Sequence, residues 1–224
     1  SSGKSINKAS DNPAGFVISE QMKAQISGLE QEIQNLEMNA GKLQAADGYL
    51  GTLSEDLLQL KSDITAAANS GFNDEGQVEA LKRSIESTVK AYNDKIDNST
   101  YGKQALLDGS ENSAADISKL ENPDVSNAEN AAKALEGIDE AISEVSDARG
   151  EIGSTIENEI ESGIRNMQTS VRNLSSARSA ISDTDYAKEM SNMISQQIKL
   201  QSATAMLSQG NMIAQMMPSM LGSV

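Results

Sequence analysis

The sequence predicts a mainly α fold: an elongated helical bundle, or coiled-coil rod, of long antiparallel helices with a small β-hairpin-like arm and a C-terminal helix. Apolar residues recur at steps of three and four over long stretches, which is the pattern of helices packed side by side. The 224 residues include only 3 Pro, so few positions forbid a helix. Aromatic residues make up 3% and Trp is absent, so the core has to be aliphatic.

The first long helix is predicted to begin at Pro13, after a polar linker over residues 1–12. Asn12 and Pro13 are the residue types of an N-cap and a first helical position. Glycines cluster where the apolar repeat changes phase near Ala46, and each weakens a helix by about 1 kcal/mol relative to Ala. We expect packing partners to hold the helix together at this point. The repeat consists of Ile26, Leu29, Ile33, Leu36, Ala40, Leu43, Leu50, Leu53, Leu57, Leu60 and Ile64.

The middle of the chain is predicted to hold a second helix, an arm and a loop. Asn69-Ser70-Gly71 carries a glycine signal for a helix end. Residues 101–109 predict a short extended piece or hairpin arm. The polar residues 110–127 predict a distal loop at the far end of the molecule. The second helix is marked by Val78, Leu81, Ile85, Val89, Tyr92 and Ile96.

A third long helix is predicted from about Asn127 to Ser182. Three successive steps of four between Ile152 and Ile164 relax the left-handed supercoil at mid-helix. The carboxylates of Asp183-Thr184-Asp185 suit the start of a new helix, through capping and the helix dipole. The sequence therefore predicts a helical rod domain over residues 13–182 and a separate helix over 183–224.

The C-terminal segment differs in composition from the rest of the chain. Seven of the ten Met follow Tyr186, and no charged side chain follows Lys199. A helix of this kind would be poorly soluble alone, so we expect a partner to cover it.

Composition excludes most catalytic chemistry. With neither Cys nor His, the chain has no disulfides, thiol nucleophile, imidazole acid–base group or usual zinc ligands. The net charge of −15 argues against nucleic acid and anionic membranes, and no run reaches the roughly 18 apolar residues of a membrane span. Glu157, Glu159 and Glu161 point in different directions, as on a solvated face, and capping is the expected role of Asp183 and Asp185. We predict a protein that is not an enzyme, with no catalytic residue, cofactor, metal or membrane insertion.

Two motifs near the ends of the chain resemble bacterial flagellins. The first is Ile6-Asn7-Lys8-Ala9-Ser10-Asp11-Asn12-Pro13-Ala14-Gly15, continuing to Leu29. The second runs from Ile181-Ser182-Asp183-Thr184-Asp185-Tyr186 to Ala203-Thr204-Ala205-Met206-Leu207-Ser208-Gln209-Gly210-Asn211. The resemblance covers nearly the whole chain. It implies a secreted structural subunit of the flagellar filament, which self-assembles by helix packing into a hollow helical polymer for motility.

The resemblance also assigns parts to the chain. Residues 183–224 correspond to the C-terminal inner-tube helix, and residues 110–127 are too few for an outer domain, so this would be a minimal flagellin. The N-terminal inner-tube helix is expected to be missing, and we expect no filament assembly without it. A hook–filament junction protein and a secreted helical adhesin or effector remain as alternatives. The stretch from Met206 to Asn211 favours flagellin over the junction protein.

Three kinds of partner follow from the resemblance: other flagellin subunits, a cytoplasmic export chaperone and an innate immune flagellin receptor. The receptor window corresponds to Leu57–Ile64, where Gln59 stands at the position at which potent flagellins carry Arg. Because Gln lacks the donor fork of Arg, Gln59, Leu60 and Lys61 form a poor match, and we predict weak or absent receptor activation. The residues expected to serve in polymerisation and chaperone binding are Met190, Ile194, Ile198, Met206, Leu207, Ile213, Met217 and Leu221.

Overall fold

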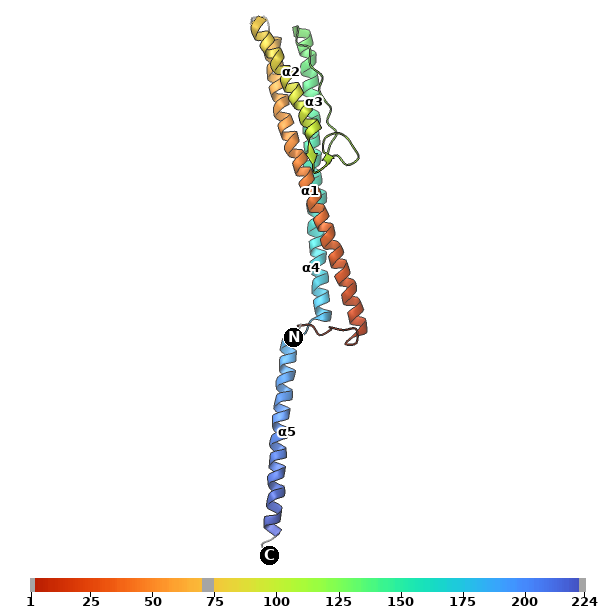
Figure 1. Cartoon of the computed structure of the whole chain (residues 1–224), viewed down its shortest axis with the longest axis vertical. Coiled ribbons are helices and arrows are strands. Elements are labelled where there is room, and N and C mark those ends of the chain that lie inside the picture. Colours follow the sequence, from red (N-terminus) through yellow and green to blue (C-terminus); the bar gives the residue numbers. More distant parts are fainter. Residues whose placement is uncertain (1–2, 70–74, 222–224) are drawn as a thin grey trace. The chain divides into compact units, whose positions relative to one another are not determined.

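The chain is mostly helical, with one small hairpin, as Figure 1 shows. The computed structural model describes residues 3–69 and 75–221, and it describes side chains for residues 3–69 and 76–212. This architecture confirms the mainly α fold predicted from the apolar repeats. The elements are α1 (Pro13–Ala68), α2 (Glu75–Asn98), β1 (Thr100–Tyr101), β2 (Gln104–Ala105), α3 (Ala128–Ser154), the π-helical η2 (Thr155–Glu161), α4 (Ser162–Ser182) and α5 (Tyr186–Leu221).

Helix α1 begins at the predicted residue. The side-chain Oδ1 of Asn12 accepts a hydrogen bond from the Gly15 amide at 3.0 Å, which satisfies one of the free donors of the first turn. The helix then runs without a break to Ala68, through the glycine cluster. The predicted break at Asn69-Ser70-Gly71 lies partly outside the described residues.

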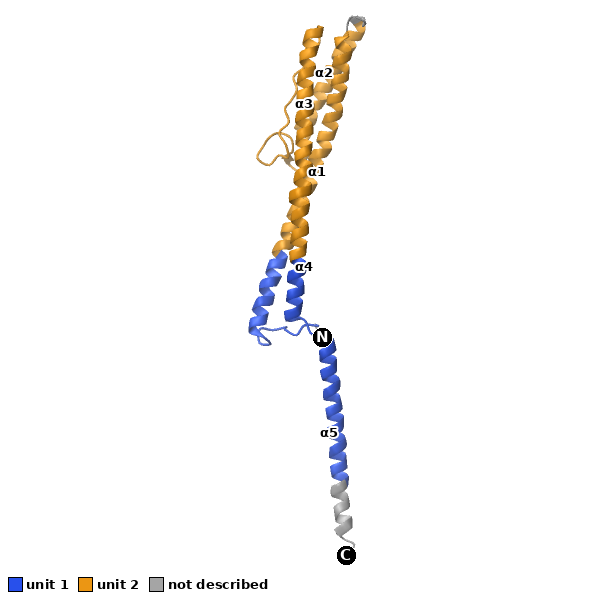
Figure 2. Ribbon diagram, turned by 180° about the vertical axis from the view of Figure 1, so that it is seen from behind, with its two compact units in different colours: residues 1–27, 171–224 blue, residues 28–170 orange. Residues whose placement is uncertain are grey.

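Two compact units divide the chain: residues 1–27 with 171–224, and residues 28–170 (Figure 2). The second unit holds the main hydrophobic core, where α1, α2 and α3 lie side by side. Side chains of all three helices fill this core at the predicted repeat positions. They include Leu50, Leu53, Leu57, Leu60 and Ile64 of α1, Ile85, Val89, Tyr92 and Ile96 of α2, and Ile138, Val145 and Ile152 of α3.

Ion pairs at the rim of this core fix the directions of the helices. Lys61 of α1 pairs with Asp139 of α3 at 2.5 Å, whereas Asp47, earlier in α1, pairs with Arg149, later in α3, at 2.7 Å. The crossed order shows that α1 and α3 are antiparallel. Helix α2 also returns antiparallel to α1, because Ser84 donates to the α1 residue Asp63 and Lys95 pairs with the earlier Asp56.

The predicted arm is a two-stranded hairpin. Thr100 pairs with Ala105 and Tyr101 with Gln104, in antiparallel register. Gly102, at the first turn position, has a φ of +66°, a conformation that Gly adopts without the steric penalty of a side chain.

The segment after the hairpin, which includes the expected loop over residues 110–127, has no regular secondary structure, yet it packs against the core of the second unit. Its apolar residues Leu106, Leu107, Ile117 and Val125 are buried in the core of the second unit. The side chain of Asn93 on α2 holds the backbone of Leu120 through two hydrogen bonds, of 2.8 and 2.9 Å. The segment therefore lies as a strap along the helices. The polarity of residues 110–127 concealed this, because a few apolar anchors suffice to bury a strap.

The third long helix contains a π-helical stretch where the repeat takes steps of four. Residues Thr155–Glu161 form η2, between the α-helices α3 and α4. Hydrogen bonds from i to i+5 give a π turn more residues than an α turn. Side chains four residues apart therefore stay closer in phase than they would in an α-helix. As a result Ile152 and Ile160 are both buried and Ile156 and Ile164 pack against the core.

Candidate assembly surface

The first unit contains a helix whose apolar side chains are uncovered. Helix α5 begins after Asp185, whose Oδ1 accepts a hydrogen bond from the Lys188 amide at 3.1 Å, as expected of an N-cap. No side chain of α5 is buried among the residues described up to Met212. Met206 is 76% and Leu207 68% exposed, values that are unusual for such large apolar residues.

The exposed apolar side chains surround the helix instead of forming one stripe. At 100° per residue, Met193 and Leu200 point within about 20° of each other, whereas Ile194 and Met206 point in two other directions, each more than 90° away. A helix that is apolar all round is normally buried. One partner along one side would therefore leave part of α5 uncovered.

The expected assembly residues have different exposures. Met190 is half-buried, and Ile194, Ile198, Met206 and Leu207 are exposed. Sequence reasoning missed Tyr186 and Leu200 as members of this surface, although their apolar character in a helix with only three charged residues was a usable signal. Ile213, Met217 and Leu221 lie in the helical backbone of α5, but their side chains are outside the described part of the chain.

The connection between α4 and α5 is held by the N-terminal segment. Ser5 and Ile6 donate their amides to the Ser182 carbonyl at 2.8 and 3.3 Å, and the Thr184 amide donates to the Gly3 carbonyl at 3.1 Å. These bonds form a short β-bridge across the link. Sequence reasoning missed it, because no local signal connects residues that are more than 170 positions apart.

The carboxylate of Asp183 has a structural role beside this bridge. It accepts hydrogen bonds from the hydroxyls of Ser179, at 2.6 Å, and Ser182, at 3.1 Å. These two bonds, from Ser179 first, hold the pKa of Asp183 below its usual value. The carboxyl group therefore stays ionised and fixes the end of α4, which does not suit acid–base chemistry.

The N-terminal motif is a compact capping structure in the same unit. Asp11 accepts the amides of Asn7 and Lys8, at 3.0 and 2.9 Å, and so closes the turn before α1. A side chain at Gly15 would lie 2.8 Å from both Asn12 and Ile6. The motif thus combines a closed turn, a cap and a position that must stay small.

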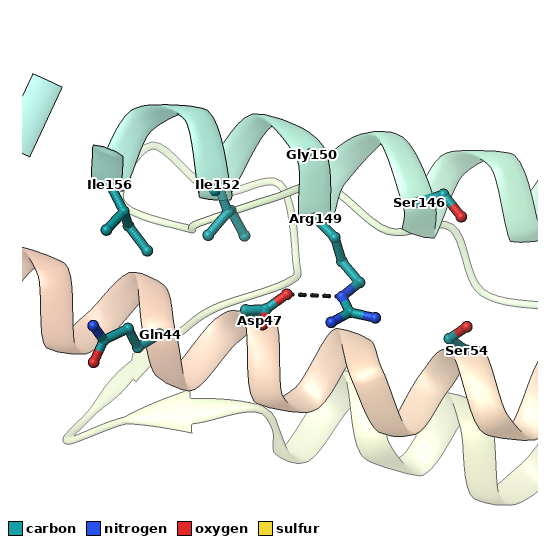
Figure 3. Close-up of a pocket in the computed structure, with 9 residues that line it drawn as sticks. Gln44, Asp47, Ser54, Ser146, Arg149, Gly150, Ile152 and Ile156 are labelled. Atoms are coloured by element: carbon teal, nitrogen blue, oxygen red, sulfur yellow. Dashed lines mark hydrogen bonds and ion pairs between the residues drawn. The ribbon is translucent and has the colours of Figure 1, made fainter. Parts of the chain in front are cut away.

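A groove between α1 and α3 in the second unit has no sign of a reactive site. Asp47 and Arg149 form an ion pair across it, and this bond raises the pKa of Arg149, so the guanidinium group remains charged (Figure 3). Ile152 and Ile156 point toward α1 from the opposite helix (Figure 3). The other residues that line the groove are Gln44, Ser54, Ser146, Gly150 and Gly153.

Neither a metal site nor a membrane-spanning helix is present among the described residues. They contain no group of three or more acidic side chains placed to hold a metal ion. Among them, no helix is long and apolar enough to cross a membrane.

The three residues of the expected receptor window differ in their accessibility. Gln59 is exposed and its amide donates to Asp63 at 2.8 Å. Lys61 is half-buried and paired with Asp139. Leu60 is fully buried in the core, so only Gln59 and Lys61 present side chains at the surface.

Fold and surface together define a helical protein with one helix, α5, whose described apolar side chains are uncovered. Models of the bacterial flagellin N-terminal helical region and C-terminal helical region match residues 1–112 and 135–221. A flagellin of Halalkalibacterium halodurans is 30% identical, covering 94% of this chain and 85% of that protein. The flagellar filament 33 kDa core protein of Treponema phagedenis is 27% identical, covering 99% of this chain and 89% of that protein. The crystal structure of Bacillus cereus flagellin has 17% identity and a TM-score of 0.47, covering 72% of this chain and 94% of that one.

The chain belongs to the bacterial flagellin family. It is a structural subunit of the flagellar filament, the secreted extracellular polymer of bacterial motility, and it assembles with other flagellin subunits. These matches favour neither of the alternatives, a hook–filament junction protein or a secreted adhesin or effector.

Proposed function

We propose that α5 is the part of this flagellin that neighbouring subunits enclose in the filament, and that its burial drives assembly into a hollow tube. The observation that carries this proposal is the exposure of Ile194 and Ile198 on one side of the helix and of Leu207 on the opposite side. Full burial of such a side chain stabilises by about 1.5–3 kcal/mol, so a few of them suffice for a stable polymer contact. Contacts that do not close on themselves then give a helical filament instead of a ring.

A charge on α5 tests this proposal. In Leu207→Lys an ammonium group would have to be desolvated inside the polymer, so the pelletable fraction should fall at least tenfold at equal protein concentration. Leu207→Met is the matched control, since it keeps an apolar side chain of similar volume and should assemble like the parent chain. Sedimentation after addition to short filament seeds is the measurement, because the seeds supply a formed polymer end and the chain does not have to start a filament, which we do not expect it to do alone. Equal incorporation of the Lys and Met variants would remove α5 from the assembly surface.

We also propose that residues 13–182 act as the rod and residues 183–224 as a tail that an export chaperone covers before assembly. The support is that this exposed helix, which has no charged side chain after Lys199, is separated from α4 by only Asp183-Thr184-Asp185. A chain ending at Ser182 should melt cooperatively within a few degrees of the full chain and should fail to co-elute with the flagellar export chaperone. Unchanged co-elution by the shortened chain would place the chaperone elsewhere.

Innate immune recognition is proposed to be weak. The amide of Gln59 donates to Asp63 and offers no guanidinium fork, and Leu60 is in the core. The unmodified protein should give little signal in receptor reporter cells beside a potent flagellin at equal concentration. Strong activation by the unmodified protein would contradict this proposal. Gln59→Arg alone does not test it, since neighbouring residues differ as well.

We propose that the chain is not an enzyme. The support is that the whole sequence has no Cys and no His, and that the Asp183 carboxylate is held in a structural role by two hydrogen bonds.

A further inference from the structure

Charge is separated along the third long helix. Its first part, residues 128–161, holds ten acidic and two basic residues, a net charge of −8 within a chain of −15. Helix α4 continues the same chain with Arg165, Arg172 and Arg178 and no acidic residue at all. Helix α4 is therefore a cationic stretch in an acidic protein.

The unpaired acidic residues of α3 lie in one stripe. Glu136, Glu140, Asp147 and Glu151 are exposed, and their side chains have neither an ion pair nor a hydrogen bond within the described residues. At 100° per residue all four point within about 60° of one another, opposite the buried Ile138. We call these four residues the α3 acidic stripe. Nothing in the fold of one copy uses them.

The exposed arginines of α4 match this stripe in sign and spacing. Arg165 and Arg172 are exposed and seven residues apart, two helical turns or about 10 Å along the helix. Glu140 and Asp147 have the same separation. Arg165 pairs with Glu161 one turn away at 3.2 Å, a surface pair that contributes little and is easily exchanged.

We propose that in the polymer the Arg165 and Arg172 face of α4 docks on the α3 acidic stripe of a neighbouring copy. This inference rests on the proposed assembly function and names one contact surface within it. Copies packed with acidic stretch against acidic stretch would repel each other, whereas a shift that brings α4 beside α3 joins opposite charges and fixes the register. Copies pointing in the same direction would place Arg165 opposite Glu140 and Arg172 opposite Asp147.

Charge reversal on each side provides the first test, with the pelletable fraction on filament seeds as the readout. R165E/R172E makes both surfaces acidic, and E140K/D147K makes both basic, so each chain alone should incorporate at least tenfold less than the parent. An equimolar mixture should regain most of the loss, because acidic α4 then meets basic α3 and the reverse. R83E/K90E is the matched control for R165E/R172E. It replaces two exposed cations of α2, also seven residues apart, and changes the net charge by the same amount.

A cross-link provides the second test. Since the chain has no Cys, E140C/R165C introduces the only two thiols. They are 25 residues apart on one continuous helical run, about 37 Å, so a disulfide can form only between copies. Under mild oxidation the assembled variant should give a ladder of linked chains, and E140C/R83C should not.

The outcomes separate the two proposals. If the parent chain does not incorporate on seeds, the assembly function itself is at fault. If the parent incorporates and R165E/R172E does so as well as R83E/K90E, the docking of α4 on α3 is wrong. The docking proposal would also be overturned if the mixture did not recover incorporation although circular dichroism showed all variants to be folded. A ladder of linked chains from both cysteine pairs would overturn it as well.

Discussion

At the residue scale, four of the five residues from Asp11 to Gly15, at the start of α1, each have a separate task. Asp11 closes the preceding turn, Asn12 caps the helix and Pro13 occupies the first helical position. Gly15 leaves room for Asn12 and Ile6. These tasks explain why a motif of such small and polar residues stands beside a long apolar repeat. They also give predictions for single substitutions.

Asn12→Ala should destabilise the chain by about 1 kcal/mol, because the first-turn amide of Gly15 loses its acceptor. The control is Asn39→Ala, an exposed position in the interior of the same helix, where Ala has the higher helix propensity. Urea unfolding followed by circular dichroism measures both. Equal midpoints for the two variants would mean that the cap contributes nothing.

Gly109→Ala should be costly for two reasons. Gly109 has a φ of +68°, which costs an L-residue about 1–2 kcal/mol, and a side chain there would lie 2.5 Å from the Asp116 carboxyl group. Gly48→Ala is the opposite case, since the added methyl group meets no heavy atom within 4 Å inside a helix. The first variant should lower the melting temperature and the second should raise it. A stabilised Gly109→Ala would contradict the described strap geometry.

At the element scale, the apolar repeats predicted the helices well because burial and helical periodicity are both local properties. Leu50 to Ile64 are buried as the repeat requires, and Asn12 and Asp185 cap where their residue types indicated. The strap over residues 106–125 and the bridge between Ser5 and Ser182 could not be predicted in this way. Both depend on contacts between distant parts of the sequence, and polar composition hides them.

The candidate site was predictable to the same extent. The exposed apolar residues of α5 followed from composition alone, because a helix that is rich in Met and has no charge after Lys199 has little charged surface to turn to water. Which of them are half-buried, as Met190 is, depends on tertiary contacts that no periodicity reports. The burial of Leu60 beside the exposed Gln59, by contrast, is what the α1 repeat implies.

The π-helical η2 gives a prediction about deletion. Removing the exposed Asn158 would let Thr155–Glu161 form an ordinary α-helix, with apolar steps of four, three and four between Ile152 and Ile164. The apolar face is then preserved, so the melting temperature should change by only a few degrees. Deleting the exposed Ser143 from α3 turns the following part of the helix by about 100° and should prevent cooperative folding. If both deletions lowered the melting temperature equally, the fold would not tolerate the loss of a residue from η2 any better than from α3.

At the scale of the whole molecule, stability is unevenly distributed. The second unit buries its helices in a shared core with ion pairs between them, whereas α5 keeps its described side chains uncovered. Regions with few buried contacts open at low free-energy cost.

Limited trypsin digestion of the unassembled chain should therefore cut after Lys188 and Lys199 well before Lys61 or Arg149, which are paired between helices. Mass spectrometry of the early fragments measures the order. Incorporation into filaments should protect Lys199. Early cleavage at Arg149 in the unassembled chain would show that the core opens as readily as α5.

The strap described above also creates a place where foreign sequence can be carried. The Ile117 amide bonds to the Leu107 carbonyl at 3.2 Å, and the Gly109 amide to the Ala115 carbonyl at 3.3 Å, so the two ends of the exposed turn over residues 110–113 are pinned beside each other. A peptide inserted there would leave those anchors in place, and each doubling of its length would add only about 0.6 kcal/mol of closure entropy. One subunit would then become a repeating carrier, displaying a grafted epitope at every position of the polymer.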